Sequence, residues 1–264
     1  EKMPAVRSSR ANWLAQPDIL TQIGLVYLGT AGKSDRQLAG TYFKKAIAAD
    51  KNHVPAHIGM GRYLYDSNNA GQAVKHFEAV VRAVPGHADA NAYAGVANWK
   101  LGKGKRAIAF INKAIELEPE KSRYHQWRGQ ILEKSKLYAA AAGSYKKARE
   151  LADFRIDFYI AEARCRRQAD ETDTAAEILE TLRQTHRSNA GIYNELRKIY
   201  EEAGRFTDAV AAFEDFVQVN PYRHQSWIAL VQLCEASGDD RRAEWARRRG
   251  RRTHSFFDEL LMVA

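Results

Sequence analysis

The sequence is poor in cysteine, proline and methionine, with two, six and three of these residues among 264. A chain of this size with two cysteines is not held together by a framework of disulfides. No apolar run approaches the roughly 20 residues that span a bilayer, and the N-terminal residues lack the apolar core of a secretory signal. The residues given therefore do not describe a disulfide-rich or membrane-spanning protein.

Signals of catalysis or metal binding are incomplete. The stretch 29–34 ends like a phosphate-binding loop, but Tyr27 stands where such a loop needs a glycine, and no strand is expected before it. His53 and His57 have the spacing of a helical pair of metal ligands, but Pro55 lies between them. We therefore expect no enzymatic activity, no metal site and no cofactor.

What the sequence does contain is an internal repeat with a constant interval of 34 residues. Alanine marks it at Ala39, Ala73, Ala107, Ala141, Ala175, Ala209 and Ala243. Small residues recur twelve positions before these alanines, at Gly61, Gly95, Gly129 and Ala163. Large apolar residues recur four positions after them, at Phe43, Phe77, Ile111, Tyr145, Leu179 and Phe213. A period of this length indicates stacked hairpins of two helices.

Close packing of the two helices explains why small residues recur at these places. Two antiparallel helices of a hairpin approach closely only where neither carries a large side chain, so Gly61 is expected to face Ala73. The polar stretch 66–71 would turn the chain, and Pro85 would end the second helix. The pattern resembles the tetratricopeptide repeat family. That resemblance implies an all-α, right-handed superhelical solenoid of about seven helix-turn-helix hairpins with a C-terminal capping helix.

The resemblance covers residues 17–257. It predicts repeats at 17–53, 54–87, 88–121, 122–155, 156–189, 190–223 and 224–257. Each hairpin buries its apolar face only against its neighbours, so we expect one elongated array without a linker. His57 and His125 share their place in the repeat with Tyr193 and Trp227, which indicates packing roles for the two histidines.

The ends of the array differ from its middle. Residues 1–16 are expected to form an N-terminal extension and residues 258–264 a cap. An apolar stripe would lie over the last hairpin, and it consists of Phe256, Phe257, Leu260, Leu261 and Ala264. The last repeat departs from the pattern, because Arg247 and Gly250 stand where Phe213 and Phe216 stood one repeat earlier.

The two cysteines, Cys165 and Cys234, fall on first helices two repeats apart. Neighbouring packed helices are already about 8–10 Å apart, beyond the roughly 7 Å that a disulfide bridges. We therefore expect free thiols, which favour a cytoplasmic location over a secreted one. Because the sequence begins with Glu1 and not with Met, an upstream signal would give the alternative, a periplasmic or envelope-associated location.

Positive charge is concentrated near the end of the chain. The formal net charge is +9, and the segment from Arg241 to Arg252 carries seven arginines and one glutamate. This basic patch would attract an acidic protein, RNA or an anionic lipid, or would simply be the solvated face of a terminal helix. It consists of Arg241, Arg242, Arg247, Arg248, Arg249, Arg251 and Arg252.

In the tetratricopeptide repeat family, first helices line a concave groove through side chains at fixed places of each repeat. The aromatic members would bury apolar groups of a peptide, and the arginines would hold its carboxylates. The alternative is that Tyr93 and Trp127 pack between adjacent first helices. Carried over place by place, the resemblance predicts a groove of Arg62, Tyr65, Tyr93, Trp99, Arg123, Gln126, Trp127, Gln130, Arg164, Arg167, Asn194 and Lys198.

We expect a non-catalytic scaffold or adaptor that binds an extended partner segment with acidic and apolar residues in this groove. By analogy with the family, and with a composition typical of bacterial chains, we place it in a bacterial assembly for pilus formation, secretion, polysaccharide export or regulation. Two alternatives stay open. They are RNA binding through the basic patch and self-assembly of solenoids end to end.

Overall fold

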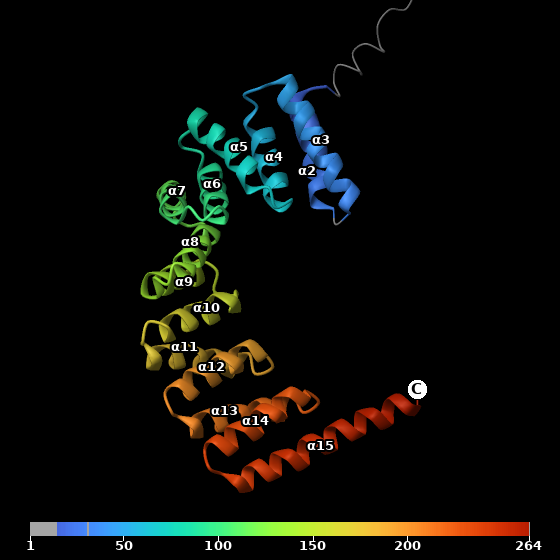
Figure 1. Cartoon of the computed structure of the whole chain (residues 1–264), viewed down its shortest axis with the longest axis vertical. Helices are drawn as coiled ribbons and strands as arrows, with labels where there is room; N and C mark the ends of the chain where they lie inside the picture. Colours follow the sequence, from blue (N-terminus) through green and yellow to red (C-terminus); the bar gives the residue numbers. More distant parts are fainter. Residues whose placement is uncertain (1–14, 31, 264) are drawn as a thin grey trace, which may run out of the picture. The chain divides into compact units, whose positions relative to one another are not determined.

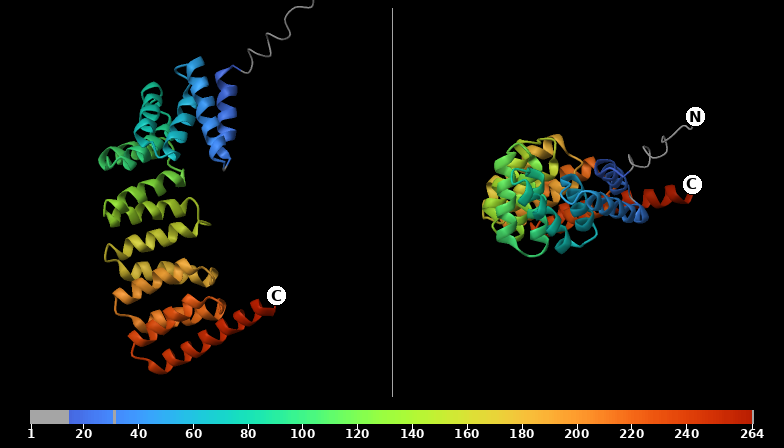
Figure 2. Two further views of the ribbon diagram at one scale, coloured as in Figure 1. Left: turned by 45° about the vertical axis from the view of Figure 1, so that its right-hand side comes forward. Right: turned by 90° about the horizontal axis from the view of Figure 1, so that it is seen from above.

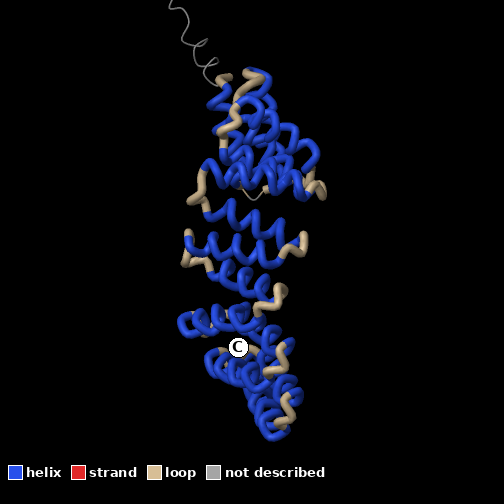
Figure 3. The backbone as a smooth tube through the Cα atoms, turned by 90° about the vertical axis from the view of Figure 1, so that its left-hand side faces the viewer, coloured by secondary structure: helices blue, strands red, loops and turns tan. Residues whose placement is uncertain are grey.

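The structure is a computed structural model that describes residues 15–30 and 32–263, without the side chains of Lys33 and of 254–263. In this part of the chain there are fourteen helices joined by short turns, and no strand (Figure 3). Most of the predicted N-terminal extension 1–16 lies outside the described residues. The side chains of the predicted capping stripe, Phe256, Phe257, Leu260, Leu261 and Ala264, lie outside them as well.

Contacts group the chain into two compact units, Glu1–Ser135 and Lys136–Ala264, where the repeat pattern predicted one continuous array. The boundary falls at a turn inside the window 122–155. Sequence periodicity does not reveal such a boundary, because every repeat contacts only its neighbours and the period continues across it. Each unit has its own buried core.

In the described part of the first unit, consecutive helices pair into hairpins (Figure 1). Its helices are α2 (Pro17–Gly29), α3 (Lys33–Ala49), α4 (Val54–Asp66), α5 (Ala70–Ala83), α6 (Ala88–Lys100), α7 (Gly104–Leu117) and α8 (Ser122–Lys134). The stretch 29–34, which resembled the end of a phosphate-binding loop, is the turn between α2 and α3.

In the second unit, helices α10 to α15 lie one beside the next in a stack (Figure 2). Its helices are α9 (Tyr138–Glu150), α10 (Ile156–Arg167), α11 (Thr172–Thr185), α12 (Ala190–Glu202), α13 (Phe206–Val219), α14 (His224–Ala236) and α15 (Asp240–Val263). From α4 onward, each first helix begins at the first residue of a predicted repeat window.

The recurring glycines make room for large side chains of the second helix. A Cβ added to Gly61 would lie 2.5 Å from the ring of Phe77, and one added to Gly95 would lie 2.7 Å from Ile111. At the equivalent place in the next hairpin, a Cβ on Gly95 would also lie 3.0 Å from the carbonyl oxygen of Ala107, the counterpart of Ala73. Ala73 is fully buried, but the ring of Phe77 is what fills the space above the glycine.

The turns inside the hairpins share one backbone conformation. A residue with positive φ follows the first helix at Asn68, Gly102, Lys136, Asp170, Gly204 and Gly238, again 34 residues apart. The next amide donates back to a carbonyl of the last helical turn, as Lys103 N does to Asn98 O at 3.0 Å. This is the Schellman type of helix ending, in which a left-handed residue lets otherwise unpaired carbonyls accept hydrogen bonds.

The turns between repeats are closed by a side chain of the following first helix. His57 Nε2 lies 2.9 Å from the carbonyl oxygen of Lys51, and His125 Nε2 lies 2.8 Å from that of Pro119. Trp227 Nε1 donates in the same way to Pro221 O at 2.7 Å. The structural roles predicted for His57 and His125 are thus confirmed, because both rings hold the preceding turn.

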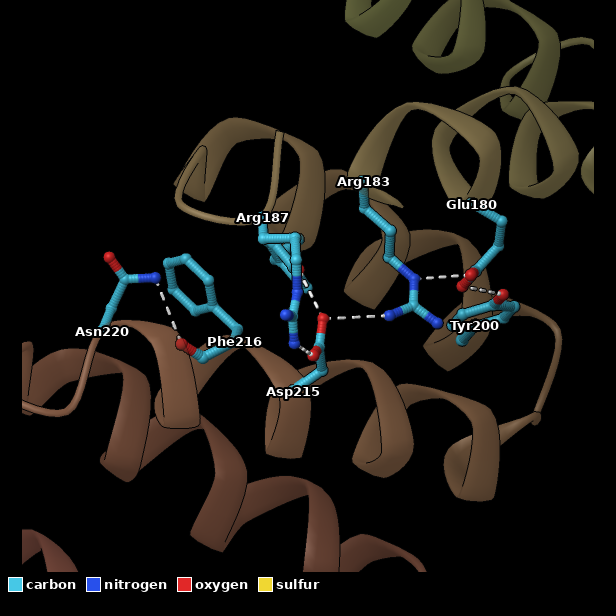
Figure 4. A network of polar contacts seen from close by, with 8 residues as sticks. Glu180, Arg183, Arg187, Tyr200, Asp215, Phe216 and Asn220 are labelled. Carbon is cyan, nitrogen blue, oxygen red and sulfur yellow. Dashed lines mark hydrogen bonds and ion pairs between the residues drawn. The ribbon is translucent and has the colours of Figure 1, made fainter. Parts of the chain in front are cut away.

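A polar network ties three helices of the second unit together (Figure 4). Asp215 of α13 accepts hydrogen bonds from Arg183 of α11 at 3.2 Å, from Arg187 in the following turn, and from the hydroxyl of Tyr193 at 2.8 Å. Burial acts to raise the pKa of Asp215, but the hydrogen bonds from Arg187 and Tyr193 and the charges of both arginines hold it below its ordinary value. Burial and the hydrogen bond to Asp215 raise the pKa of Tyr193 to about 12.

Replacing Asp215 with Asn is expected to lower the free energy of unfolding by about 1–3 kcal/mol at neutral pH, because hydrogen bonds to a charged group are lost. The folded-state pKa of Asp215 is depressed, so its contribution is present above the unfolded pKa and disappears as pH falls through the folded pKa. Urea unfolding followed by circular dichroism should show the stabilities of the two proteins converging as pH falls through the folded-state pKa of Asp215. A difference that stays constant with pH, or an equal loss in the exposed control Asp173→Asn, contradicts this role.

Candidate peptide-binding surfaces

Three first helices of the first unit, α4, α6 and α8, bring aromatic side chains of the predicted groove together. The ring of Tyr93 on α6 stacks on Phe77 at 5.3 Å between centroids and tilts against Trp127 of α8 at 5.4 Å. Trp127 in turn stacks on Tyr124 at 6.3 Å. Tyr93 and Trp127 are half-buried, so each ring packs between helices and also keeps part of its surface exposed.

Cationic side chains lie over these rings. The guanidinium of Arg62 is 5.8 Å from the ring centroid of Tyr93, and that of Arg123 is 5.7 Å from Trp127. Both arginines are exposed. A cation within about 6 Å of an aromatic face is attracted to it, so the rings hold the two guanidinium groups near the surface of the first unit. We call Arg62, Tyr93, Arg123 and Trp127 the aromatic–arginine cluster.

The other predicted residues of the first unit border this cluster. Tyr65 and Trp99 are half-buried and pack against the core formed by α6, α7 and α8. Lys100 lies 4.4 Å from the ring of Tyr65 and donates a hydrogen bond to Tyr65 O at 3.1 Å. Gln126 and Gln130 are half-buried on α8.

The orientation of α8 is fixed from beneath by a buried tyrosine. The hydroxyl of Tyr124 donates to Asp89 of α6 at 2.6 Å. Burial and this hydrogen bond raise the pKa of Tyr124 far above its usual range, so the phenol stays protonated. The hydrogen bond to Asp89 joins α8 to α6, and the stacking of Tyr124 on Trp127 supports the Trp127 ring on α8.

The predicted groove residues of the second unit are less available. Arg167 is 9% exposed and forms ion pairs with Glu195 at 3.0 Å and with Glu202, both on α12. Its guanidinium therefore joins α10 to α12. Lys198 is exposed and lies 3.3 Å from Glu195. Arg164 is half-buried with an interaction of its own, and Asn194 is exposed.

Part of the basic patch is neutralised within the second unit. Arg248 donates to Glu244 at 2.9 Å, and Arg247 pairs with both Glu235 and Glu244. Arg242 lies 3.4 Å from Asp239 and 3.7 Å from Glu214. Among the described side chains, no ion pair is found for Arg241, Arg249 or Arg251, and Arg252 has an interaction of its own.

The histidine pair and the cysteines singled out in the sequence form structural contacts. His57 Nδ1 lies 3.0 Å from His76 Nδ1, so His57 pairs across the hairpin and not with His53. Within the described residues, no group of three or more His, Cys, Asp or Glu side chains is arranged to hold a metal ion. Cys165 and Cys234 are buried free thiols, as predicted. No described helix is long and apolar enough to cross a membrane.

A family model described as tetratricopeptide repeat matches residues 58–122 and 198–250. Among curated proteins, the CTR9 homolog of Arabidopsis thaliana is 27% identical over 123 residues, which make up 45% of this chain and 11% of that protein. The chain therefore spans about a tenth of the length of that relative.

Three solved structures show the same arrangement of helices. A tetratricopeptide repeat protein from Parabacteroides merdae matches with a TM-score of 0.62 and 14% identity, over 90% of this chain and 93% of that one. YrrB, described as a TPR protein with an unusual peptide-binding site, gives a TM-score of 0.58 and 18% identity, over 71% and 96%. The MamA protein gives 0.55 and 18%, over 72% and 94%. At these identities the likeness shows the fold alone. The predicted all-α hairpin architecture is thus confirmed, and the chain has the tetratricopeptide repeat fold.

Proposed function

We propose that the aromatic–arginine cluster of the first unit binds an extended partner segment that carries large apolar and acidic residues. The observation that supports this proposal is the packing of Arg62 and Arg123 over half-exposed rings of Tyr93 and Trp127. Each ring offers apolar surface, and each guanidinium beside it offers donors to a carboxylate. Neither arginine has a carboxylate partner among the described side chains.

The chemistry assigns different tasks to the two kinds of residue. Burying an aromatic side chain fully is worth roughly 1.5–3 kcal/mol, whereas an exposed ion pair is usually worth under about 1 kcal/mol. The rings should therefore set the affinity. The arginines should set the direction of the segment and the preference for acidic sequences.

The coarse function follows from the fold. Tetratricopeptide repeat proteins are generally non-enzymatic scaffolds for protein partners, and we propose that this chain is a scaffold of that kind. YrrB, which shares the fold, is described as having a peptide-binding site. We further propose that the chain acts as an adaptor in a multi-protein assembly, in which Arg164, Asn194 and Lys198 of the second unit contact a partner as well.

Trp127→Ala is expected to weaken binding of an acidic–apolar peptide about tenfold or more, because the central ring of the cluster is removed. The peptide would come from a displayed random library selected on the parent protein, and affinity would be measured by fluorescence anisotropy. Enriched peptides should be rich in Asp or Glu and in large apolar residues. Trp99→Ala should have an effect of similar size.

Arg123→Glu is the matched variant that does not disturb the core, because Arg123 is exposed. It should lower affinity for the same peptide and reduce its dependence on salt. The control is Lys75→Glu, an equal change of charge at an exposed position of α5. If Lys75→Glu abolishes binding while Trp127→Ala and Arg123→Glu bind normally, the proposed surface is wrong. Binding of RNA with a steep loss of affinity as salt rises would favour the nucleic-acid alternative.

A further inference from the structure

The second unit carries an apolar pocket between its last two helices, α14 and α15, with a volume of about 190 Å³. Its floor is apolar, with Trp227, Ile228 and Val231 from α14. Arg247 and Arg251 of α15 stand at its rim. Ile228 is 45% exposed, so part of the apolar floor is open to an occupant. An apolar cavity of roughly 150 Å³ admits benzene, so this pocket admits one bulky apolar side chain.

One hairpin earlier, the residues at the equivalent places of the second helix are buried. On α13 the places of Arg247, Gly250 and Arg251 hold Phe213, Phe216 and Val217, and all three are at most 1% exposed. They are covered because the following helix, α14, packs on α13. The pocket therefore lies at the place where, in the preceding hairpin, the next helix packs. A helix is the shape of occupant that this surface fits.

The last hairpin exchanges the chemistry of these places. Where α13 has Phe213 and Val217, α15 has Arg247 and Arg251. Where α12 has Asn194 and Arg197, α14 has Ile228 and Val231. In the last hairpin, apolar residues thus stand on the first helix, α14, and arginines replace apolar residues on the second helix, α15. An ordinary repeat helix, apolar toward the second helix before it, would bury Arg251 without an ion-pair partner, at a high cost in free energy.

A small residue completes the pocket. A Cβ added to Gly250 would lie 2.9 Å from Cβ of Trp227, so α15 approaches α14 closely at this point. This contact seats Trp227, which is 5% exposed, against α15. The ring of Trp227 also meets Trp245 edge-on at 5.8 Å. Packing thus fixes Trp227 in the floor of the pocket, whereas Ile228 and Arg251 are exposed.

The described backbone of this chain does not cover the pocket. Helix α15 runs from Asp240 to Val263 as one helix and extends past the end of α14 without folding back over it (Figures 1 and 2). Arg247 is already paired with Glu235 and Glu244. Arg251 lines the rim and has no ion pair among the described side chains. A partner's carboxylate would therefore form its most favourable ion pair at this position.

We propose that the α14–α15 pocket is a docking site for an acidic amphipathic helix of a partner protein. The helix inserts one large apolar side chain against Trp227, Ile228 and Val231, and a carboxylate about one turn away pairs with Arg251. This second site is independent of the aromatic–arginine cluster proposed for the first unit, and it takes a helix where that cluster takes an extended segment.

The test uses two fluorescein-labelled synthetic peptides of about 16 residues, long enough for some four helical turns. Both carry Leu and Phe on one face, and they differ in having Glu or Lys at all flanking positions. Anisotropy titrations with the full chain at low salt should show the Glu peptide binding at least about tenfold more tightly than the Lys peptide. Equal binding of the two peptides overturns the proposal.

Two variants locate the binding. Ile228→Lys places a charge on the exposed floor and should lower affinity for the Glu peptide about tenfold or more, whereas Arg251→Glu should shift the preference toward the Lys peptide. The control Arg249→Glu makes the same change of charge on α15 outside the pocket lining and should leave the preference unchanged. Parent-like binding by Ile228→Lys, or an equal effect of Arg249→Glu and Arg251→Glu, refutes the site. Weaker binding of the Glu peptide by Trp127→Ala, together with parent-like binding by Ile228→Lys, would place the peptide on the first unit and refute the site.

Discussion

Replacing Gly95 with Leu is expected to destabilise the first unit by about 1–3 kcal/mol or more. A Cβ at this position would lie 2.7 Å from Cγ1 of Ile111 and 3.0 Å from the carbonyl oxygen of Ala107. Ile111 is fully buried and has no free space to enter, and the carbonyl belongs to the backbone of α7. The hairpin of α6 and α7 can therefore accept the larger side chain only by moving its helices apart.

The measurement is urea unfolding followed by far-ultraviolet circular dichroism, with the same substitution at Gly71 as the matched control. Gly71 lies near the start of α5, and a Cβ added there would meet nothing within 4 Å, so its Leu variant should lose little stability. Because α6 carries Tyr93, the Gly95 variant should also weaken peptide binding by the first unit. Equal stability of the Gly95 and Gly71 variants would show that the helices are not in close contact at Gly95.

Much of the fold is predictable from the sequence because one period governs it. The places of Gly95 and Ala107 locate both helices of a hairpin, and the helix starts follow from counting 34 residues onward. The turns were less visible. Glycine marks the left-handed residue at Gly102, but Lys136 and Asp170 adopt the same conformation without a sequence signal. The positive φ of these residues is required by the Schellman-type hydrogen bonding at the end of the helix and does not follow from the residue type.

The predicted site residues lie on the first helices that the repeat assigns to them, but the repeat pattern by itself does not predict their contacts. Several contacts join residues that lie one period plus one residue apart on successive first helices. They are Tyr65 with Lys100, Asp89 with Tyr124, Arg167 with Glu202, and Arg197 with Gln232. This spacing is a signal that the sequence contains. Applied beforehand, it would have shown that Arg167 meets a carboxylate of its own chain.

The pairing of Arg167 makes it a structural residue in our interpretation, and this gives a second large effect. Arg167→Ala should destabilise the second unit by about 3–5 kcal/mol, because Glu195, which is 4% exposed, loses the guanidinium that compensates its burial. Lys198 lies 3.3 Å from Glu195 and still compensates part of its charge, so the decrease in the free energy of unfolding should be near the lower end of that range. Lys198 is exposed, so it does not replace a buried partner.

A double-mutant cycle separates the structural role from a binding role. Combining Arg167→Met with Glu195→Leu removes both charges and should recover most of the stability, because an apolar pair of similar volume costs no desolvation. If Arg167 instead contacts the partner, the double variant will fold as well as the parent but lose affinity for the selected peptide, while Arg164→Ala leaves affinity unchanged. We expect the reverse: parent-like affinity in the double variant, and lower affinity with weaker salt dependence in Arg164→Ala. That outcome would restrict carboxylate recognition on α10 to Arg164 and assign Arg167 to holding α10 against α12.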